Sequence, residues 1–221
     1  MNYRFGIAAV LAFNSALLVL SVDANAGCGV ERWNVKTGTD PDAKLVNLKQ
    51  TDSTTIAKLI SLPAQLNPAA NVRVKPYELT VYSVDAVLTL IRPEKDSDFH
   101  LVLTDSQAKT LVAEIPSPAC VDAKSPFFKL IQNARTQFES KFPGLLGGTQ
   151  VKVPVRVRGI AFFDKLHGQT GAAPNGIELH PVLDIQFLQA AQANSLLLSA
   201  PKLNYSQREL NVAEDEDEDE D

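Results

Sequence analysis

The sequence contains few of the residues that mark common functional sites. Its 221 residues include two cysteines, three histidines, one tryptophan and one methionine. It has no glycine-rich phosphate loop, no GxSxG turn and no HExxH pair, so the usual signatures of nucleotide-binding proteins, serine hydrolases and zinc proteases are missing. The two cysteines lie too far apart for a CxxC metal or redox motif. A functional site must therefore be assembled from residues that are distant in the sequence.

Long apolar runs are also scarce, and the main one stands at the N-terminus. Arg4 precedes the apolar stretch Ile7 to Leu20, which the small residues Ala24 to Ala26 follow. This pattern is typical of a secretory signal peptide, and no later run approaches the roughly 18 apolar residues of a transmembrane helix. We predict that residues 1–26 are removed and that the mature chain, beginning at Gly27, is exported and periplasmic or extracellular.

Cys28 and Cys120 are the only cysteines of the chain. In an oxidising compartment such a pair forms a disulfide more often than it stays reduced. The bridge would close a loop of about 90 residues and contribute on the order of 4 kcal/mol in the loop-entropy model. Two free thiols are the alternative. Ala26 and Gly27 also give Cys28 a likeness to the acylated cysteine of bacterial lipoproteins, although Asn25 departs from that pattern, so lipid anchoring is a further alternative.

The net charge of −5 comes from the C-terminus of the chain. Residues 214–221 are eight acidic side chains, and without them the chain carries a charge of +3. Such a run cannot bury apolar surface, so we expect a disordered acidic tail that solvates the protein. A remaining charge this small does not by itself indicate nucleic-acid binding.

Hydrophobic periodicity predicts one β-rich domain at residues 76–188, with extensions at 27–75 and 189–213. The first extension starts with an expected short strand and turn at Val30–Asp40. It continues with a short amphipathic helix from Ile56 that a proline ends.

Within the domain, the spacing of apolar residues predicts five strands and one helix. The strands lie at Tyr77–Ile91, Asp98–Asp105, Lys109–Pro118, Thr149–Asp164 and Gly176–Phe187. The helix, Ser125–Phe142, falls between the third and fourth strands, and Gly159 marks a bulge in the fourth. This order predicts a mainly β protein with a five-stranded OB-fold barrel.

An OB-fold binds oligonucleotides or oligosaccharides across its second and third strands and beneath two loops, those between strands one and two and between strands four and five. Here those loops are Arg92–Asp98 and Asp164–Gly176. Nucleic acid and oligosaccharide are therefore the partners that the predicted fold admits, and the ligand itself stays open.

Four segments, RWNVKTGTD, DFHLVL, AEIPSPAC and FFDKLHGQTGAAPNGIELHPVLDI, together resemble a family of exported bacterial proteins without an assigned activity. The similarity covers most of the chain from Arg32 to Ile185. It implies an exported OB-fold protein and no particular reaction.

A second, more distant resemblance involves DSDFHLVLTDSQAKTLVAEIPSP, whose layout is similar to the start of the thermonuclease family of OB-folds. Asp98 and Glu114 stand where that family has calcium-binding acidic residues, so the resemblance implies a divalent metal such as calcium. Ser117 stands where the family has its general-base glutamate, and Lys109 stands near its first catalytic arginine.

The polar candidates for a site are Asp96, Asp98, His100, Glu114, His167, Glu178 and His180. We expect His100 and Glu114 side by side on adjacent strands. Glu178 and His180 share the strand face opposite the core because strands have a period of two. Imidazoles with carboxylates suit zinc, and the metal candidates are Asp98, His100, Glu114 and His180. The same histidines and Glu114 could instead perform acid–base catalysis, or the histidines could be structural.

The loop before the fifth strand is a second candidate, because loops on rigid scaffolds often bind ligands. Its ligand-binding candidates are His167, Gly168, Gln169, Asn175, Glu178 and His180. Alternatively, the glycines of this loop only supply positive φ and Asn175 only forms a turn. Aromatic side chains for base stacking are few, namely Tyr77 or Tyr82 and Phe162 or Phe163.

Two functions remain. One is an exported OB-fold binding or structural module that uses the loop before the fifth strand and the face of strands two and three. The other is a metal-dependent hydrolase, such as a phosphodiesterase, whose site would comprise Asp98, His100, Glu114 and His180. The missing general base and the few basic residues for a phosphate clamp favour the binding module.

Overall fold

The computed structural model describes residues 27–65 and 67–189. The predicted signal peptide, the predicted acidic tail and nearly all of the predicted C-terminal extension lie outside these ranges. No helix within them is long and apolar enough to cross a membrane.

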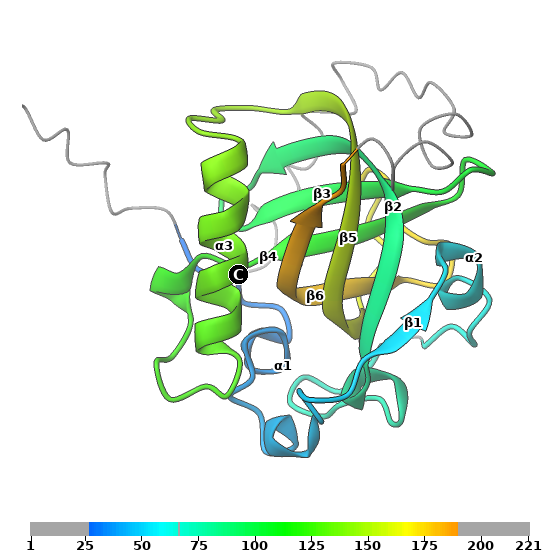
Figure 1. Ribbon diagram of the computed structural model, residues 1–221. Helices are drawn as coiled ribbons and strands as arrows, with labels where there is room; N and C mark the ends of the chain where they lie inside the picture. Colours follow the sequence, from blue (N-terminus) through cyan, green and yellow to red (C-terminus); the bar gives the residue numbers. More distant parts are fainter. Residues whose placement is uncertain (1–26, 66, 190–221) are drawn as a thin grey trace, which may run out of the picture.

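A six-stranded mixed sheet makes up most of the fold (Figure 1). The strands are β1 (Asp52–Thr54), β2 (Val81–Pro93), β3 (Phe99–Thr104), β4 (Thr110–Ile115), β5 (Thr149–Phe163) and β6 (Ile177–Phe187). Their order is β1-β2-β3-β4-β6-β5, and β2 also pairs with β5. The pairs β1–β2 and β4–β6 are parallel, and the other pairs are antiparallel.

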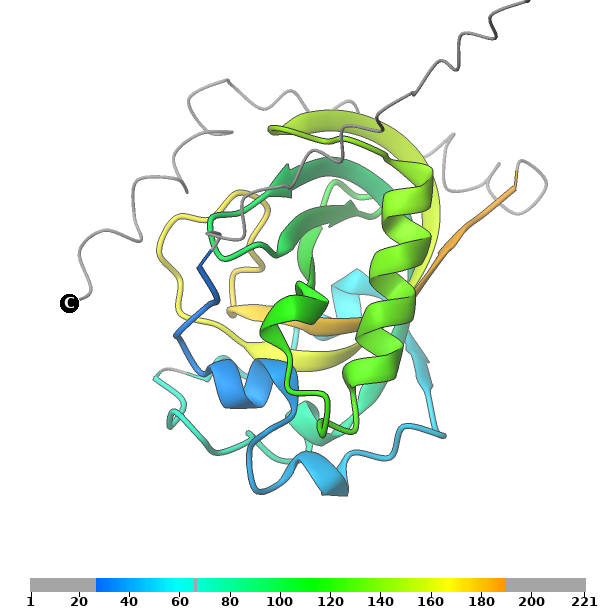
Figure 2. The ribbon, with the colours of Figure 1, turned by 90° about the vertical axis from the view of Figure 1, so that its left-hand side faces the viewer.

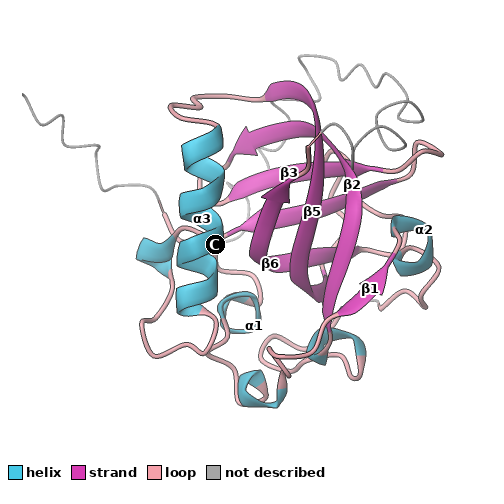
Figure 3. Cartoon of the chain, viewed as in Figure 1, coloured by secondary structure: helices cyan, strands magenta, loops and turns pink. Residues whose placement is uncertain are grey.

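The helices are few and mostly short (Figure 3). They are α1 (Trp33–Thr37), α2 (Ile56–Leu59) and α3 (Phe128–Lys141), with 3-10 turns at Ala43–Leu45, Tyr77–Leu79 and Pro118–Cys120. α3 packs against β6 and buries Ile131, Ala134 and Phe138, which recur at the spacing of one helix face.

The predicted succession of three strands, a helix and two strands is confirmed by β2, β3, β4, α3, β5 and β6. β2 begins at Val81 instead of Tyr77, because Tyr77–Leu79 forms a 3-10 turn. The predicted helix from Ile56 is confirmed, and the Thr55 side chain caps it by accepting the Lys58 N–H. The predicted bulge is confirmed by register shifts on both sides of Gly159.

The expected strand and turn at Val30–Asp40 is wrong, because this segment contains helix α1. Gly38 ends the helix in the left-handed region, at φ 76°, and donates its N–H to the Asn34 carbonyl. A side chain at Gly38 would also collide with the Phe127 ring. The alternating run is too short to distinguish a strand from a single helical turn. Gly38 at its end favours the helix.

The core lies on one side of the curved sheet, where apolar residues of β2 to β6 meet α2 and α3. Every residue of β3 is buried, and so are the first seven residues of β6. Both faces of these two strands are therefore covered, one by the core and the other by chain segments outside the sheet. The second face carries the polar candidates.

Part of that cover is the N-terminal segment Gly27–Asp40. A disulfide joins Cys28 to Cys120, and the Trp33 indole N–H donates to the Cys120 carbonyl over 3.2 Å. Arg32 forms two hydrogen bonds of 2.8 Å with the carboxylate of Glu78, and both side chains are buried. These links fix the segment against the end of β5. The predicted disulfide is thus present.

The disulfide should stabilise the protein substantially, because it joins residues 92 positions apart. Replacing both cysteines by serine is expected to lower the free energy of unfolding by about 4 kcal/mol, measured by urea denaturation. Thiol titration of the denatured, unreduced mature protein should find no free thiol. Two free thiols per chain, or an unchanged urea midpoint in the double variant, would contradict the assignment.

Candidate functional site

Five ionisable residues meet on the face of β3, β4 and β6 that lies opposite the core, and we call them the His–carboxylate cluster. They are Asp98, His100, Glu114, Glu178 and His180, and each exposes 7% of its surface or less. Charged side chains are seldom buried to this extent unless they are paired or bind a metal.

Strand register brings these residues together. His100 of β3 lies directly opposite Glu114 of β4 in an antiparallel pair. β4 and β6 pair in parallel with Val112 beside Glu178, so the same offset places Glu114 next to His180. Both expected pairings, His100 with Glu114 and Glu178 with His180, are confirmed by contacts of 3.1 and 3.2 Å.

Glu114 is the centre of the cluster because its two oxygens reach different histidines. Oε1 lies 3.1 Å from His100 Nδ1, and Oε2 lies 2.8 Å from His180 Nδ1. His180 Nδ1 also lies 3.2 Å from Glu178 Oε1. The δ nitrogen of His180 therefore donates to carboxylates, which leaves its ε nitrogen for another partner.

His180 Nε2 and Asp98 Oδ2 face each other across 3.6 Å, and both atoms are buried. Neither atom has a hydrogen-bond partner within the part of the chain that the structure describes. The other oxygen of Asp98 accepts the Ser117 backbone N–H over 3.1 Å, which fixes the carboxylate. A buried nitrogen and a buried oxygen thus point at one location without a bond to each other.

The loop between β5 and β6 covers the cluster on one side. His100 Nε2 donates to the Thr170 carbonyl over 2.8 Å. The next residue, Gly171, lies so close to Val102 that a side chain there would collide with it. Figure 2 shows this loop and the N-terminal segment on the same side of the molecule.

The N-terminal segment covers another part of the cluster, next to Phe162 and His180. The Arg32 guanidinium and the Lys36 ammonium both lie over the Phe162 ring, 4.6 and 5.2 Å from its centre. Phe162 in turn contacts the His180 ring, with the ring centres 5.7 Å apart. The cluster is therefore closed in by a segment that the disulfide tethers.

Further charged groups surround the cluster. Glu94 Oε1 lies 3.5 Å from His100 Nδ1 and accepts a hydrogen bond of 2.9 Å from Arg92 Nη2. Lys36 Nζ lies 3.9 Å from Asp164 Oδ1 at the opposite end. Asp96 Oδ1 accepts the backbone N–H of Asp98 over 3.0 Å.

Four carboxyl groups in and around the cluster have raised pKa values. Burial, with the neighbouring charge of Asp96, raises the pKa of Asp98 to about 8. Burial, with the charge of Glu114, raises the pKa of Glu178 to about 8. Burial also raises the pKa of Glu94 and of Asp96. At neutral pH, protons therefore supply part of the positive charge that the cluster needs.

The pKa values of Glu114, His180 and Lys36 shift in the direction that favours the charged form of each group. Burial alone would raise the pKa of Glu114, but the hydrogen bonds with His100 and His180 hold it well below its usual value. Burial alone would lower the pKa of His180, but Glu114 and Glu178 raise it to about 10. Lys36 behaves similarly, since Asp164, Glu114 and Glu178 raise its pKa despite burial. Glu114 is thus the ionised anion at the centre.

Among the residues that the structure describes, two groups of three could each hold a metal ion, with one ligand atom per residue. One is Asp98, Glu114 and His180, and the other is Glu94, His100 and Glu114. Within each group the ligand atoms lie within 4.8 Å of one another. All four metal candidates from the sequence belong to these groups, and Glu94 is added to them.

The ligand-binding candidates in and after the loop between β5 and β6 lie in different surroundings. His167 and Gly168 are exposed, and the Gln169 amide donates to Asp164 and to the Lys165 carbonyl. The Asn175 amide donates to the carbonyls of Leu59 and Leu62 and thereby ties the loop to α2 and the residues after it. Positive φ angles occur at Gly168, Gly171 and Gly176. Of this set, only Glu178 and His180 belong to the cluster.

Sequence reasoning missed several charged residues at this site, namely Lys36, Arg92, Glu94 and Asp164. The hairpin register could have indicated two of them, because Arg92 pairs with His100 and the Glu94 N–H donates to the Asp98 carbonyl. Lys36 had no such signal, since it enters from a helix that is distant in the sequence.

The other expectations concern single residues. Phe162 and Phe163 are fully buried, so they offer no surface for base stacking, whereas Tyr77 and Tyr82 are half-buried. Lys109 is exposed in the turn between β3 and β4.

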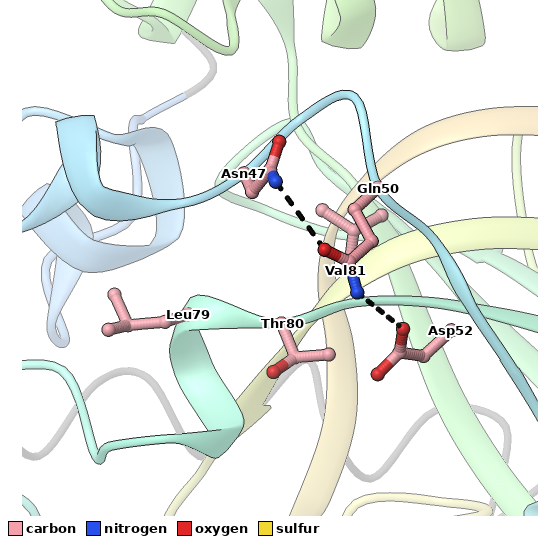
Figure 4. Close-up of a pocket in the computed structure, with 6 residues that line it drawn as sticks. All are labelled: Asn47, Gln50, Asp52, Leu79, Thr80 and Val81. Atoms are coloured by element: carbon pink, nitrogen blue, oxygen red, sulfur yellow. Dashed lines mark hydrogen bonds between the residues drawn. The ribbon is translucent and has the colours of Figure 1, made fainter.

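A small surface pocket of about 100 Å³ lies elsewhere, next to the start of β2 (Figure 4). It is lined by Asn47, Gln50, Asp52, Leu79, Thr80 and Val81. The Asn47 amide donates to Gln50, and the Gln50 amide donates to Asp52. Because these polar groups already bond to one another, the His–carboxylate cluster is the stronger candidate site.

Removing the His180 side chain should destabilise the protein even without added metal. His180→Ala leaves the carboxylates of Glu114 and Glu178 buried without that donor, so we expect a loss of about 1–3 kcal/mol in urea melts with EDTA. His167→Ala, at an exposed histidine, is the matched control and should change stability by less than about 0.5 kcal/mol. Equal, small losses in both variants would show that the cluster does not depend on His180.

Comparison of the chain with protein-family models and with curated proteins finds no match. The resemblances to an exported bacterial family and to thermonuclease therefore stay predictions.

Proposed function

We propose that this protein is an exported OB-fold module that binds a divalent metal ion, best matched by zinc, in the His–carboxylate cluster. The observation that carries this proposal is the pair of buried, unpartnered atoms His180 Nε2 and Asp98 Oδ2, 3.6 Å apart. A cation between them would complete the coordination of both atoms.

The distances and residue types support zinc. Zinc binds imidazole nitrogen and carboxylate oxygen at about 2.0–2.2 Å, so two of its ligand atoms in a tetrahedral site lie roughly 3.4 Å apart. The observed 3.6 Å between His180 and Asp98 is close to this value. Calcium, which the thermonuclease resemblance implies, takes oxygen ligands, so the histidine favours zinc.

The groups behind the ligands support the same proposal. Metal-binding histidines usually donate their second ring N–H to a carboxylate or a backbone carbonyl, which fixes the ring. His180 has this arrangement, because Nδ1 donates to the carboxylates of Glu114 and Glu178 while Nε2 faces Asp98. Asp98 is likewise held by the Ser117 N–H.

The strand connections support the OB-fold part of the proposal. Strands β2, β3, β4, β6 and β5 are neighbours in this order, and the further β2–β5 pairing supports closure into a barrel. α3 falls between the third and fourth strands of that set, as the OB-fold requires. The cluster then lies on the face of strands two and three and under the loop between strands four and five, where OB-folds bind ligands.

Export is part of the proposal because two features agree with it. The N-terminal sequence is typical of a signal peptide. The disulfide between Cys28 and Cys120 fits an oxidising compartment.

A metal-dependent hydrolase, such as a phosphodiesterase, is the second candidate function. The meeting of Asp98, His100, Glu114 and His180 in one cluster favours it. However, a hydrolytic metal needs an open coordination position for water and substrate, and the ligand residues are buried. Ser117 also offers no carboxylate as a general base. A metal ion with a binding or structural role is therefore the better proposal.

Zinc should stabilise the protein through this site. After EDTA treatment and dialysis of the mature chain, added zinc is expected to raise the free energy of unfolding by about 2.7 kcal/mol when its free concentration is 100 times Kd. Asp98→Asn keeps the shape of the side chain but removes its charge, so this variant should lose most of the gain. Urea melts with and without zinc measure both quantities.

His167→Ala controls for zinc bound at an exposed histidine, and it should respond to zinc like the wild type. An equal zinc response in Asp98→Asn and the wild type, or no response in the wild type, would contradict the proposal.

A further inference from the structure

We infer that the cluster contains a second metal position, formed by Glu94, His100 and Glu114, beside the position proposed at Asp98 and His180. The inference rests on the proposed function, because the first cation is the one proposed at Asp98 and His180. It goes further by making the site dinuclear and by giving each histidine its own ion.

The geometry of Glu114 is the first argument. Its Oε1 lies 3.1 Å from His100 Nδ1, and its Oε2 lies 2.8 Å from His180 Nδ1. One carboxylate therefore serves both groups of possible ligands, each of which has its ligand atoms within 4.8 Å of one another. Oε1 would bind the second cation, whereas Oε2 accepts the N–H of His180 Nδ1 and so orients the ring whose Nε2 faces the first cation.

The hydrogen bonding of His100 is the second argument. The Thr170 carbonyl can only accept, so His100 Nε2 carries the hydrogen of that 2.8 Å bond. In the neutral ring, Nδ1 then presents a lone pair to two carboxylate oxygens, Glu114 Oε1 at 3.1 Å and Glu94 Oε1 at 3.5 Å. Three electron-pair donors that face one another are held together by a cation between them, which is either a proton on Nδ1 or the metal ion that replaces it. A backbone carbonyl on the far nitrogen is also a common support for a metal-binding histidine.

The charge balance is the third argument. Besides the two histidines, the cluster and its surroundings contain six carboxylates, namely Glu94, Asp96, Asp98, Glu114, Asp164 and Glu178, and the two cations Lys36 and Arg92. Histidines that bind metal are neutral. With every carboxyl group ionised, four negative charges then remain, a total that two divalent cations balance in place of the protons that the metal-free cluster holds.

The positions of the two cationic side chains agree with this balance. Arg92 donates to Glu94 at one end, over 2.9 Å, and Lys36 lies 3.9 Å from Asp164 at the other. The four remaining negative charges thus fall in the middle, around Glu114. The two histidines lie there as well.

The test is the number of zinc ions bound per chain. The mature, disulfide-bonded protein is treated with EDTA, given five equivalents of zinc sulfate, passed through gel filtration and analysed by native mass spectrometry and elemental analysis. We expect two zinc ions in the wild type and in the control variant His167→Ala. We expect one in His100→Ala and one in Glu94→Gln.

Glu94→Gln keeps the test valid if His100→Ala does not fold. The Glu94 side chain is 22% exposed and the change preserves its shape, so we expect this variant to fold. One zinc ion in the wild type would overturn the second position and leave the proposed function standing. Two ions in the wild type and in both cluster variants would also overturn it, because the second ion would then bind elsewhere. No bound zinc in the wild type would overturn both proposals.

Discussion

The carboxylate of Glu114 is the group around which the buried polar face of this protein is arranged. Its two oxygens contact histidines from two different strands, at 3.1 and 2.8 Å. In a buried environment this arrangement fixes the ring orientations of both histidines, because an unpaired charge there costs several kcal/mol. His180 therefore turns Nε2 towards Asp98, and His100 turns Nε2 towards the Thr170 carbonyl. The neighbouring carboxyl groups of Glu94, Asp98 and Glu178 leave an excess of negative charge around Glu114. We interpret this excess as the place of metal cations.

The cover over the cluster belongs to the same arrangement. The N-terminal segment places Lys36 against the carboxylates, and the disulfide and the Arg32–Glu78 ion pair hold that segment. A closed cover lowers the local dielectric constant, which strengthens each electrostatic interaction and increases the cost of an unbalanced charge. We therefore expect the segment, the disulfide and the bound cations to stabilise one another.

The sequence predicted the order of strands and helix because strand and helix periods are local properties. It also predicted the pairs His100–Glu114 and Glu178–His180, since pleating and hairpin register fix which residues share a face. The meeting of the two pairs at Glu114 depends on the parallel contact between β4 and β6, which local patterns do not determine. Burial of the cluster depends on a helix at Trp33–Thr37 that we had expected to be a strand. The role of Lys36 was missed for this tertiary reason, whereas the hairpin register between β2 and β3 could have indicated Glu94.

The central claim is that a divalent cation binds between Asp98 and His180. Anomalous diffraction at the zinc absorption edge, from crystals of the zinc-loaded mature protein, tests this claim most directly. The account predicts an anomalous peak within about 2.2 Å of Asp98 Oδ2 and His180 Nε2. Anomalous peaks confined to exposed residues such as His167, with Asp98 and His180 well ordered and no peak between them, would contradict it.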